Sequence, residues 1–227
     1  MFRHLYAPST LLPERQFEQW CASGRVIEQD QRGPKVIILD NGDFLKIFRA
    51  RHVISGTRIY SHARRFYRNS LRLAELKIPT VTVKALYHFN QSGQTAVLYQ
   101  PLPGHSIRDL VRDDIYLLDK SAEKLGKFLA KMHLRGVHFH SLHTGNILFL
   151  PNQEFGLIDI SDMSIYRWPL MCITRYRSFK RLCKYKEDIM LLGQGYWERM
   201  LEQYFRYSFS SPLCQKKIQS CNPFVTP

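Results

Sequence analysis

The hydrophobic pattern of the chain changes at the segment QPLPGH, residues 100–105. Before this segment, short runs rich in Val, Ile, Leu and aromatic residues are bounded by turn residues, which is typical of β-strands. After it, residues 117–136 have apolar side chains at the spacing of an amphipathic helix, with Gly136 as the expected stop. A sheet-rich part followed by a helical part predicts an α+β fold.

The first hundred residues predict a sheet with one helix inserted between its strands, after a short helix at 15–22. The Asn41-Gly42 pair predicts a type I′ hairpin between the second and third strands. The expected strands and the inserted helix are, in order, 24–30, 35–39, 43–48, helix 60–76, 80–89 and 95–102.

The second part predicts mainly helices around one strand hairpin. A short helix begins near Ser106, two strands at 146–150 and 155–160 flank Pro151-Asn152, and residues 174–207 have helical character. A chain of 227 residues accommodates one domain with two lobes. The expected division is a first lobe at 1–98, a hinge at 99–105, a second lobe at 106–207 and a disordered tail at 208–227.

The net charge of +14 is far from zero and bears on partners rather than on fold. Residues 46–72 carry eight Lys or Arg and no acid, and residues 164–186 carry seven and no acid, interleaved with Tyr and Trp. Three interpretations stay open: a solvated basic face, a surface for an anionic membrane or phosphoglycan, and a nucleic-acid surface. We expect the second of these rather than nucleic acid.

The sequence also predicts a location in the cell. Its first twenty residues contain no apolar segment of signal-peptide length, and no run of residues is apolar enough for a transmembrane helix. The five cysteines show no C-x-x-C spacing and are expected to be free thiols. We therefore expect a cytoplasmic protein.

Three polar residues stand out within the predicted strands. Lys46 interrupts an apolar strand, while Asn146 begins one strand of the predicted hairpin and Asp159 ends the other. An Asn and an Asp at one end of a hairpin supply hard oxygen ligands, which predicts a Mg²⁺ site. The histidines of HFHSLH (138–143) offer a zinc site as the alternative, although no nearby cysteine completes a ligand set.

The segments FLKIF, HSLHTGNILF and GLIDIS, in this order, resemble the protein-kinase-like fold. The nearest resemblance is to the bacterial lipopolysaccharide kinases that phosphorylate Kdo or heptose, some of whose relatives are labelled toluene-tolerance proteins. The likeness spans about residues 25–190. It implies two lobes, with Lys46 on the phosphates of ATP and Mg²⁺ on Asn146 and Asp159. It also implies an adenine-facing hinge in LYQPLPG, at Gln100 and Leu102.

The chain departs from this family's pattern at the catalytic loop. Ser141 stands where the catalytic Asp is expected, and a serine hydroxyl is not a base at neutral pH. The catalytic candidates are therefore Ser141 itself together with His143 and Asp162, and His140 is a further alternative. No choice among them follows from the sequence.

Two further departures concern the first lobe. The helix at 60–76 places Arg68 or Asn69 where a glutamate should pair with Lys46, and Glu75 lies near its end. No glycine-rich phosphate loop is present.

The resemblance implies an ATP-dependent phosphotransferase that acts on a sugar hydroxyl of a lipopolysaccharide-core glycolipid. Such a protein would be peripheral at the cytoplasmic face of the inner membrane. The alternative is a pseudokinase scaffold or regulator of envelope biosynthesis, which the loss of the catalytic Asp favours. A third possibility is an RNA-binding accessory protein, recognisable by steeply salt-dependent binding.

Overall fold

The structure is a computed structural model that describes residues 8–49, 62–90, 93–119 and 121–224. The chain divides into two compact units. The sheet unit comprises Met1–Glu75 and Thr80–Leu102, and the helical unit comprises Leu76–Pro79 and Pro103–Pro227. The predicted α+β plan, with a small sheet part before a helical part, is confirmed.

The described strands of the sheet unit form a six-stranded sheet in the order β1-β5-β6-β4-β3-β2. All neighbours are antiparallel except β1, which the sequence did not predict and which pairs parallel with β5. The strands are β1 (Thr10–Leu11), β2 (Arg25–Asp30), β3 (Gly33–Ile38), β4 (Phe44–Phe48), β5 (Thr82–His88) and β6 (Thr95–Gln100). The predicted helices are also present, as α1 (Glu14–Ser23) and α2 (His62–Glu75); residues 60 and 61 lie outside the described part.

The turn between β3 and β4 differs from its prediction. A type I′ turn needs positive φ at both central residues, but of the pair only Gly42 has one, at 81°. Gly42 N donates to Leu39 O, and Leu39 N donates to Asp43 O, so the loop contains three residues. The prediction of an antiparallel pair is right and the predicted turn type is wrong, because Asp40 lengthens the loop by one residue.

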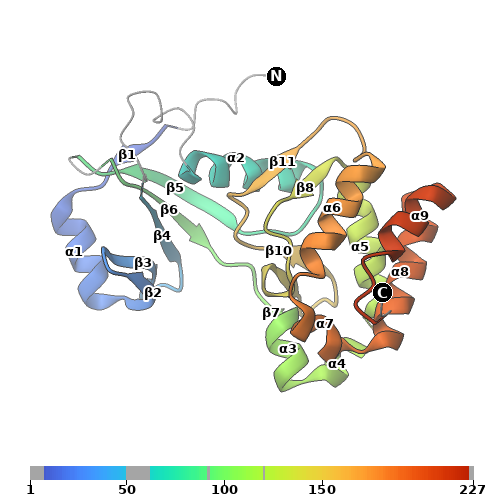
Figure 1. Cartoon of the computed structure of the whole chain (residues 1–227). Helices are drawn as coiled ribbons and strands as arrows, with labels where there is room; N and C mark the ends of the chain where they lie inside the picture. The colour runs from blue at the N-terminus through green and yellow to red at the C-terminus, as the bar shows by residue number, and fades with distance from the viewer. Residues whose placement is uncertain (1–7, 50–61, 91–92, 120, 225–227) are drawn as a thin grey trace. The chain divides into compact units, whose positions relative to one another are not determined.

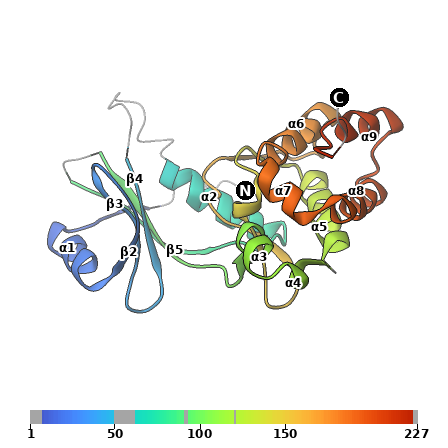
Figure 2. The same ribbon diagram turned by 60° about the horizontal axis from the view of Figure 1, so that its bottom comes forward.

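The two helices of the sheet unit cover opposite faces of its sheet (Figure 2). Alternate residues of a strand point to opposite faces. Leu45 and Ile47 of β4 face the side where Phe17 and Trp20 of α1 pack. Lys46, between them, therefore faces the side where Phe66 of α2 lies.

The helical unit contains seven described α-helices and three short strand pairings. Its helices are α3 (Ile107–Asp113), α4 (Ile115–Asp119), α5 (Ala122–Leu134), α6 (Cys172–Leu182), α7 (Lys186–Leu192), α8 (Gln194–Ser208) and α9 (Pro212–Gln219). Its strands are β7 (His105–Ser106), β8 (Val137–Phe139), β9 (Ile147–Phe149), β10 (Phe155–Leu157) and β11 (Met163–Ile165).

Helices α5 and α8 pack side by side in the helical unit (Figure 1). The rings of His133, Tyr204 and Phe179 form a cluster, with the His133 centroid 5.6 Å from that of Tyr204 and 6.1 Å from that of Phe179. Gly136, with a φ of 74°, ends α5 as predicted, since few other residues adopt this conformation without strain. The expected tail contains α9 instead of disorder at 212–219, because Cys214 and Ile218 are buried.

The segment Leu76–Pro79 belongs to the helical unit although the sheet unit surrounds it in sequence. The carbonyl of Pro79 accepts a hydrogen bond from Leu157 N at 2.9 Å. The carbonyl of Lys77 accepts from Lys131 Nζ at 2.7 Å. Backbone groups of this segment are thus paired with α5 and β10.

Candidate active site

The β9–β10 hairpin brings Asn146 and Asp159 to the same end. Ile147 pairs with Leu157 as the last residues of the ladder. Beyond them, Ile158 N donates a hydrogen bond to Asn146 O at 3.1 Å. Asn146 therefore precedes one strand directly opposite the point where Asp159 follows the other, as the sequence predicted.

The side chain of Asn146 is held in one orientation. Its Nδ2 donates to the carbonyl of Ser141 at 3.0 Å, and the residue is buried. The loop is shaped by His143, whose Nδ1 accepts from Gly145 N at 3.1 Å and whose carbonyl accepts from Asn146 N. Because the amide nitrogen of Asn146 is engaged by Ser141, its amide oxygen is directed away from the loop carbonyl.

Asp159 has a left-handed backbone conformation, with a φ of 52°. Only short polar residues and glycine adopt this region readily, and strained residues of this kind gather at functional sites. The hairpin and the turn that follows it therefore impose a conformation on the carboxylate that the chain does not adopt by default.

Ser141 contacts a carboxylate from the turn that precedes β11 (Met163–Ile165). Ser141 Oγ donates to Asp162 Oδ2 at 3.0 Å. Strand β11 pairs with β8, and His140 N donates to Asp162 O at 3.0 Å just beyond that ladder. The two short strands thus place a carboxylate on the hydroxyl of the predicted catalytic loop.

His143 is a neutral imidazole at physiological pH. Burial lowers its pKa, the charge of Arg108 acts in the same direction, and the carboxylates of Asp159 and Asp188 oppose the shift without reversing it. Since Nδ1 accepts from Gly145, the neutral ring carries its proton on Nε2. Its ring lies 4.8 Å from that of Tyr185, so it is fixed in place as a hydrogen-bond donor.

A buried carboxylate, Asp188, is hydrogen-bonded to the loop and was not singled out from the sequence. Asp188 accepts hydrogen bonds from Thr144 Oγ1 and from Arg108 Nε, the latter at 2.8 Å, and lies 3.4 Å from Arg112. Burial alone would raise its pKa, but the bonds from Thr144 and Arg108 and the charges of Arg108 and Arg112 lower it. The only available signal was an acid within the apolar stripe of α7, beside Ile189.

Lys46 of the sheet unit lies among aromatic rings. Its Nζ is 5.7 Å from the ring centroid of Phe48 and 6.0 Å from that of Phe66 on α2. Glu75 of the same helix is exposed and lies 3.9 Å from Arg72. The contacts of Lys46 therefore include cation–π interactions.

The remaining predicted residues of the sheet unit lie at the end of one strand. Gln100 is the exposed last residue of β6, and Leu102 follows it, half-buried. The structure thus brings Ser141, His143, Asn146, Asp159 and Asp162 together in the helical unit, and it places Lys46, Gln100 and Leu102 in the sheet unit.

The histidines of the zinc alternative do not converge. The rings of His138 and His140 are neighbours, with centroids 4.2 Å apart, but His143 turns toward Tyr185. In the described part of the chain, no group of three or more His, Cys, Asp or Glu side chains is arranged to hold a metal. Asn146 with Asp159 offers two ligands, which is the usual protein share for Mg²⁺.

The basic and aromatic segment 164–186 is divided between surface and core. Tyr166, Trp168 and Met171 are exposed, whereas Phe179 is buried. The first basic segment, 46–72, lies partly outside the described residues, including Arg51 and Arg58. No helix in the described ranges is both long enough and apolar enough to cross a bilayer.

Comparison of the sequence with models of protein families gives no match. Comparison with curated proteins gives no match either.

Proposed function

We propose that the chain has a protein-kinase-like fold and is an ATP-dependent phosphotransferase. The acceptor we propose is a sugar hydroxyl of a lipopolysaccharide-core glycolipid at the cytoplasmic face of the inner membrane. The observation that supports transfer is the 3.0 Å hydrogen bond between Ser141 and Asp162, since it brings a carboxylate to the position where the resemblance implies a catalytic Asp. The acceptor follows from the sequence resemblance alone.

In this proposal Asp162 takes up the proton that the acceptor hydroxyl loses. Ser141 Oγ already donates to Asp162, so its lone pairs are available to accept a hydrogen bond from the acceptor and align it. Neutral His143 donates through Nε2 and orients a phosphate or acceptor oxygen. Phosphoryl transfer depends mainly on position and charge, so a displaced carboxylate is compatible with catalysis.

The residues at the end of the β9–β10 hairpin fit a magnesium ion. The amide oxygen of Asn146 and the carboxylate of Asp159 are hard oxygen donors, and phosphate oxygens and water would complete the shell. When bound, the ion neutralises negative charge on the phosphates. Lys46 would orient the phosphates, and Gln100 and Leu102 would face the adenine.

The pseudokinase scaffold remains the second candidate because of one observation. The cation of Lys46 lies near Phe48 and Phe66, at the face where a glutamate of α2 is expected by resemblance. A protein of this kind could bind nucleotide without transferring phosphate.

Thermal unfolding with and without excess Mg·ATP tests the binding half of the proposal. A ligand at 100 times its Kd stabilises by about 2.7 kcal/mol, which shifts Tm by several degrees. We expect a Mg-dependent shift in the wild type that Asp159→Ala abolishes. Asp113→Ala, at an exposed residue of α3, is the control that should keep the shift.

Transfer of labelled phosphate from ATP to core glycolipid tests the second half. Turnover by the wild type that is lost in Asp162→Asn supports the enzyme. A nucleotide-dependent shift in Tm without turnover supports the scaffold. If millimolar nucleotide leaves Tm unchanged, both the enzyme and the nucleotide-binding scaffold are contradicted.

A further inference from the structure

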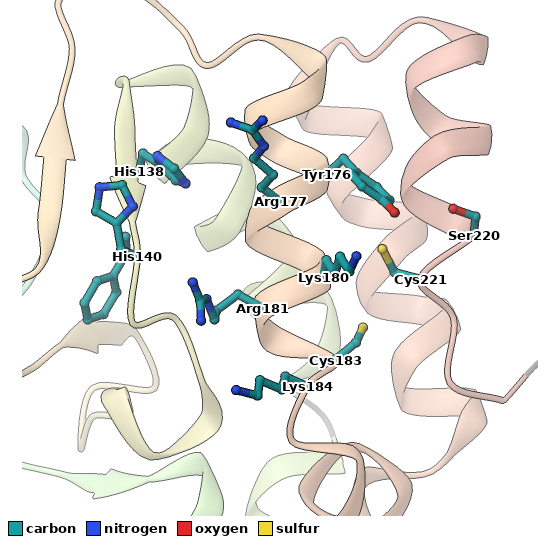
Figure 3. A pocket seen from close by; sticks show the side chains of 11 residues that line it. His138, His140, Tyr176, Arg177, Lys180, Arg181, Cys183, Lys184, Ser220 and Cys221 are labelled. Carbon is teal, nitrogen blue, oxygen red and sulfur yellow. The ribbon is translucent and has the colours of Figure 1, made fainter.

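A pocket of about 690 Å³ lies in the helical unit, between α6, β8 and the end of α9 (Figure 3). Its size is within the range of small-molecule sites. We call it the α6 pocket. It is lined by His138, Phe139, His140, Tyr176, Arg177, Lys180, Arg181, Cys183, Lys184, Ser220 and Cys221.

One face of α6 supplies the charge of the α6 pocket. Arg177, Lys180 and Arg181 follow the i, i+3, i+4 spacing that places side chains on one helical face, and Lys184 follows two residues after the helix ends. In Figure 3, Arg177 and Arg181 extend toward the side of the pocket formed by β8. Like charges at this spacing destabilise a helix, so the cluster costs stability in the free protein.

These four cations are not neutralised by the described part of the protein. No carboxylate lines the pocket, and none of the four is in an ion pair with a described residue. Cations elsewhere in the chain do have such partners: Lys84 contacts Asp43, and Arg108 contacts Asp188. A merely solvated basic face needs no hollow, whereas here the cations gather around one.

The imidazole of His138 lies on the opposite wall of the pocket and is kept neutral mainly by its burial. Burial lowers the pKa of His138 to about 4, and the charges of His140, Arg177 and Arg181 act in the same direction against Asp162. His138 is therefore a neutral hydrogen-bonding group at physiological pH. It faces Arg177 and Arg181 together with His140 (Figure 3), whereas Tyr176 and Ser220 line the pocket on the other side of α6.

The spacing of the cations indicates the kind of anion. Lys184 lies two residues beyond the end of α6, whereas Arg177 and Arg181 are four residues apart on the helix, about 6 Å along its axis. That span exceeds a single phosphate, and the two guanidinium groups are suited to bidentate binding of phosphate oxygens. The ring of Tyr176 also lines the pocket, and Lys217 Nζ lies 5.3 Å from its centroid.

We propose that the α6 pocket binds a ligand that carries two or more phosphate groups on a small ring, such as a bisphosphorylated sugar. The same chemistry occurs in a free metabolite and in a lipid headgroup. The proposal concerns binding, and it stands whether or not the chain transfers phosphate. If it does transfer phosphate, the pocket adjoins Ser141 through β8 and would hold the charged part of the acceptor.

The test is equilibrium binding of fructose 1,6-bisphosphate to the full chain, measured by calorimetry over a range of salt concentrations. We expect the binding to depend on salt concentration. The double variant Arg177→Gln/Arg181→Gln should weaken it by at least about tenfold, since each charge-assisted hydrogen bond that is lost contributes to the binding free energy. The control is Arg206→Gln with Lys216→Gln. It removes the same charge from exposed positions of α8 and α9 that do not line the pocket.

Two further arms identify the source of the ligand. Phosphatidylcholine vesicles carrying a bisphosphorylated sugar headgroup are compared with vesicles carrying phosphatidylglycerol. Binding to the first kind alone, lost in the Arg177/Arg181 variant, assigns the pocket to a lipid headgroup. Binding of the soluble bisphosphate without vesicle binding assigns it to a free metabolite. Both results support the proposal.

The pKa of His138 gives a readout that does not depend on the binding affinity. A bound polyanion should raise its pKa from about 4, because it cancels the positive field of α6. Should the arginine variant fail to fold, Lys180→Gln with Lys184→Gln serves in its place. Equal loss of binding in the control variant overturns the proposal, as does binding of single-stranded RNA but not of the bisphosphate.

Discussion

Ser141 and Asp162 form a hydrogen-bonded pair, with Oγ and Oδ2 3.0 Å apart. The serine comes from the loop after β8, and the aspartate comes from the turn before β11. The pair places a serine hydroxyl beside a carboxylate, at the position where the resemblance implies a carboxylate alone. This relationship yields the first prediction.

Asp162→Asn should lower kcat for phosphate transfer by about 10²- to 10⁴-fold, because the loop loses its proton acceptor. Ser141→Ala should lower kcat by only about tenfold, since the carboxylate remains and one aligning hydrogen bond is lost. Ser141→Asp should rescue the Asp162→Asn variant in part. The measurement is steady-state transfer at saturating Mg·ATP. A larger loss in Ser141→Ala than in Asp162→Asn would assign the catalytic role to the serine instead.

The left-handed backbone of Asp159 gives a prediction about stability. Glycine adopts a positive φ at no steric cost, whereas alanine does not. Asp159→Gly should therefore be more stable than Asp159→Ala by about 1 kcal/mol in urea unfolding. Both variants should lose the Mg·ATP shift.

Gln153, with a φ of 62° in the exposed β9–β10 turn, is the matched control. Its Gly and Ala variants should show the same order of stability and retain nucleotide binding. Equal stability of the two Asp159 variants would mean that the backbone relaxes and holds no strain at this site.

Asp188→Ala should destabilise the protein by about 3 kcal/mol, because it leaves Arg108 and Thr144 without their buried partner. The pKa of Asp188 is lowered from its ordinary value of 3.8. Its stabilisation is therefore complete above that value and is lost as pH falls through the lower pKa of the folded state. Unfolding free energies at pH 7 and near pH 3 measure this loss, which Asp188→Asn should lack.

His133 makes the folded protein sensitive to milder acid. Burial lowers its pKa from 6.5 to about 3, and the charge of Arg175 adds to the shift. The unfolded chain takes up a proton below pH 6.5 while the folded chain does not, so acid favours unfolding. Between pH 7.5 and pH 5 this one group should cost about 2 kcal/mol.

The measurement is the free energy of unfolding across this pH range in the wild type and in His133→Phe with Tyr204→Phe. The second change removes the other half of a contact, because the Tyr204 hydroxyl lies 2.9 Å from His133 Nδ1. The double variant should have a flatter pH profile. An unchanged slope would indicate that His133 becomes protonated inside the fold.

The sequence was sufficient to predict most of the sheet unit, because its strands are bounded by turn residues and its helices have apolar stripes. It also predicted that Asn146 and Asp159 meet, since a hairpin with a short turn fixes which ends coincide. Patterns of this kind are local, and both residues lie at the ends of strands that pair with each other.

The contact between Ser141 and Asp162 was not predictable in the same way. Strands β8 and β11 have three residues each, which is too short for an alternating pattern, and they pair across the intervening hairpin. Asp188 was missed for a related reason: its partners Arg108 and Thr144 come from α3 and from the loop between β8 and β9. Tertiary packing, rather than local propensity, decides such contacts.

The segment Leu76–Pro79 has a consequence for any attempt to exchange parts between genes. Neither unit is one uninterrupted stretch of chain. A cut near residue 102 therefore gives a first fragment that keeps Leu76–Pro79 of the helical unit and a second fragment that lacks them. A fragment beginning at Pro103 would lack the Pro79 carbonyl that accepts from Leu157 N, on a strand whose residues are all buried. Exchange of the helical unit between genes would therefore require Leu76–Pro79 to be transferred together with residues 103–227.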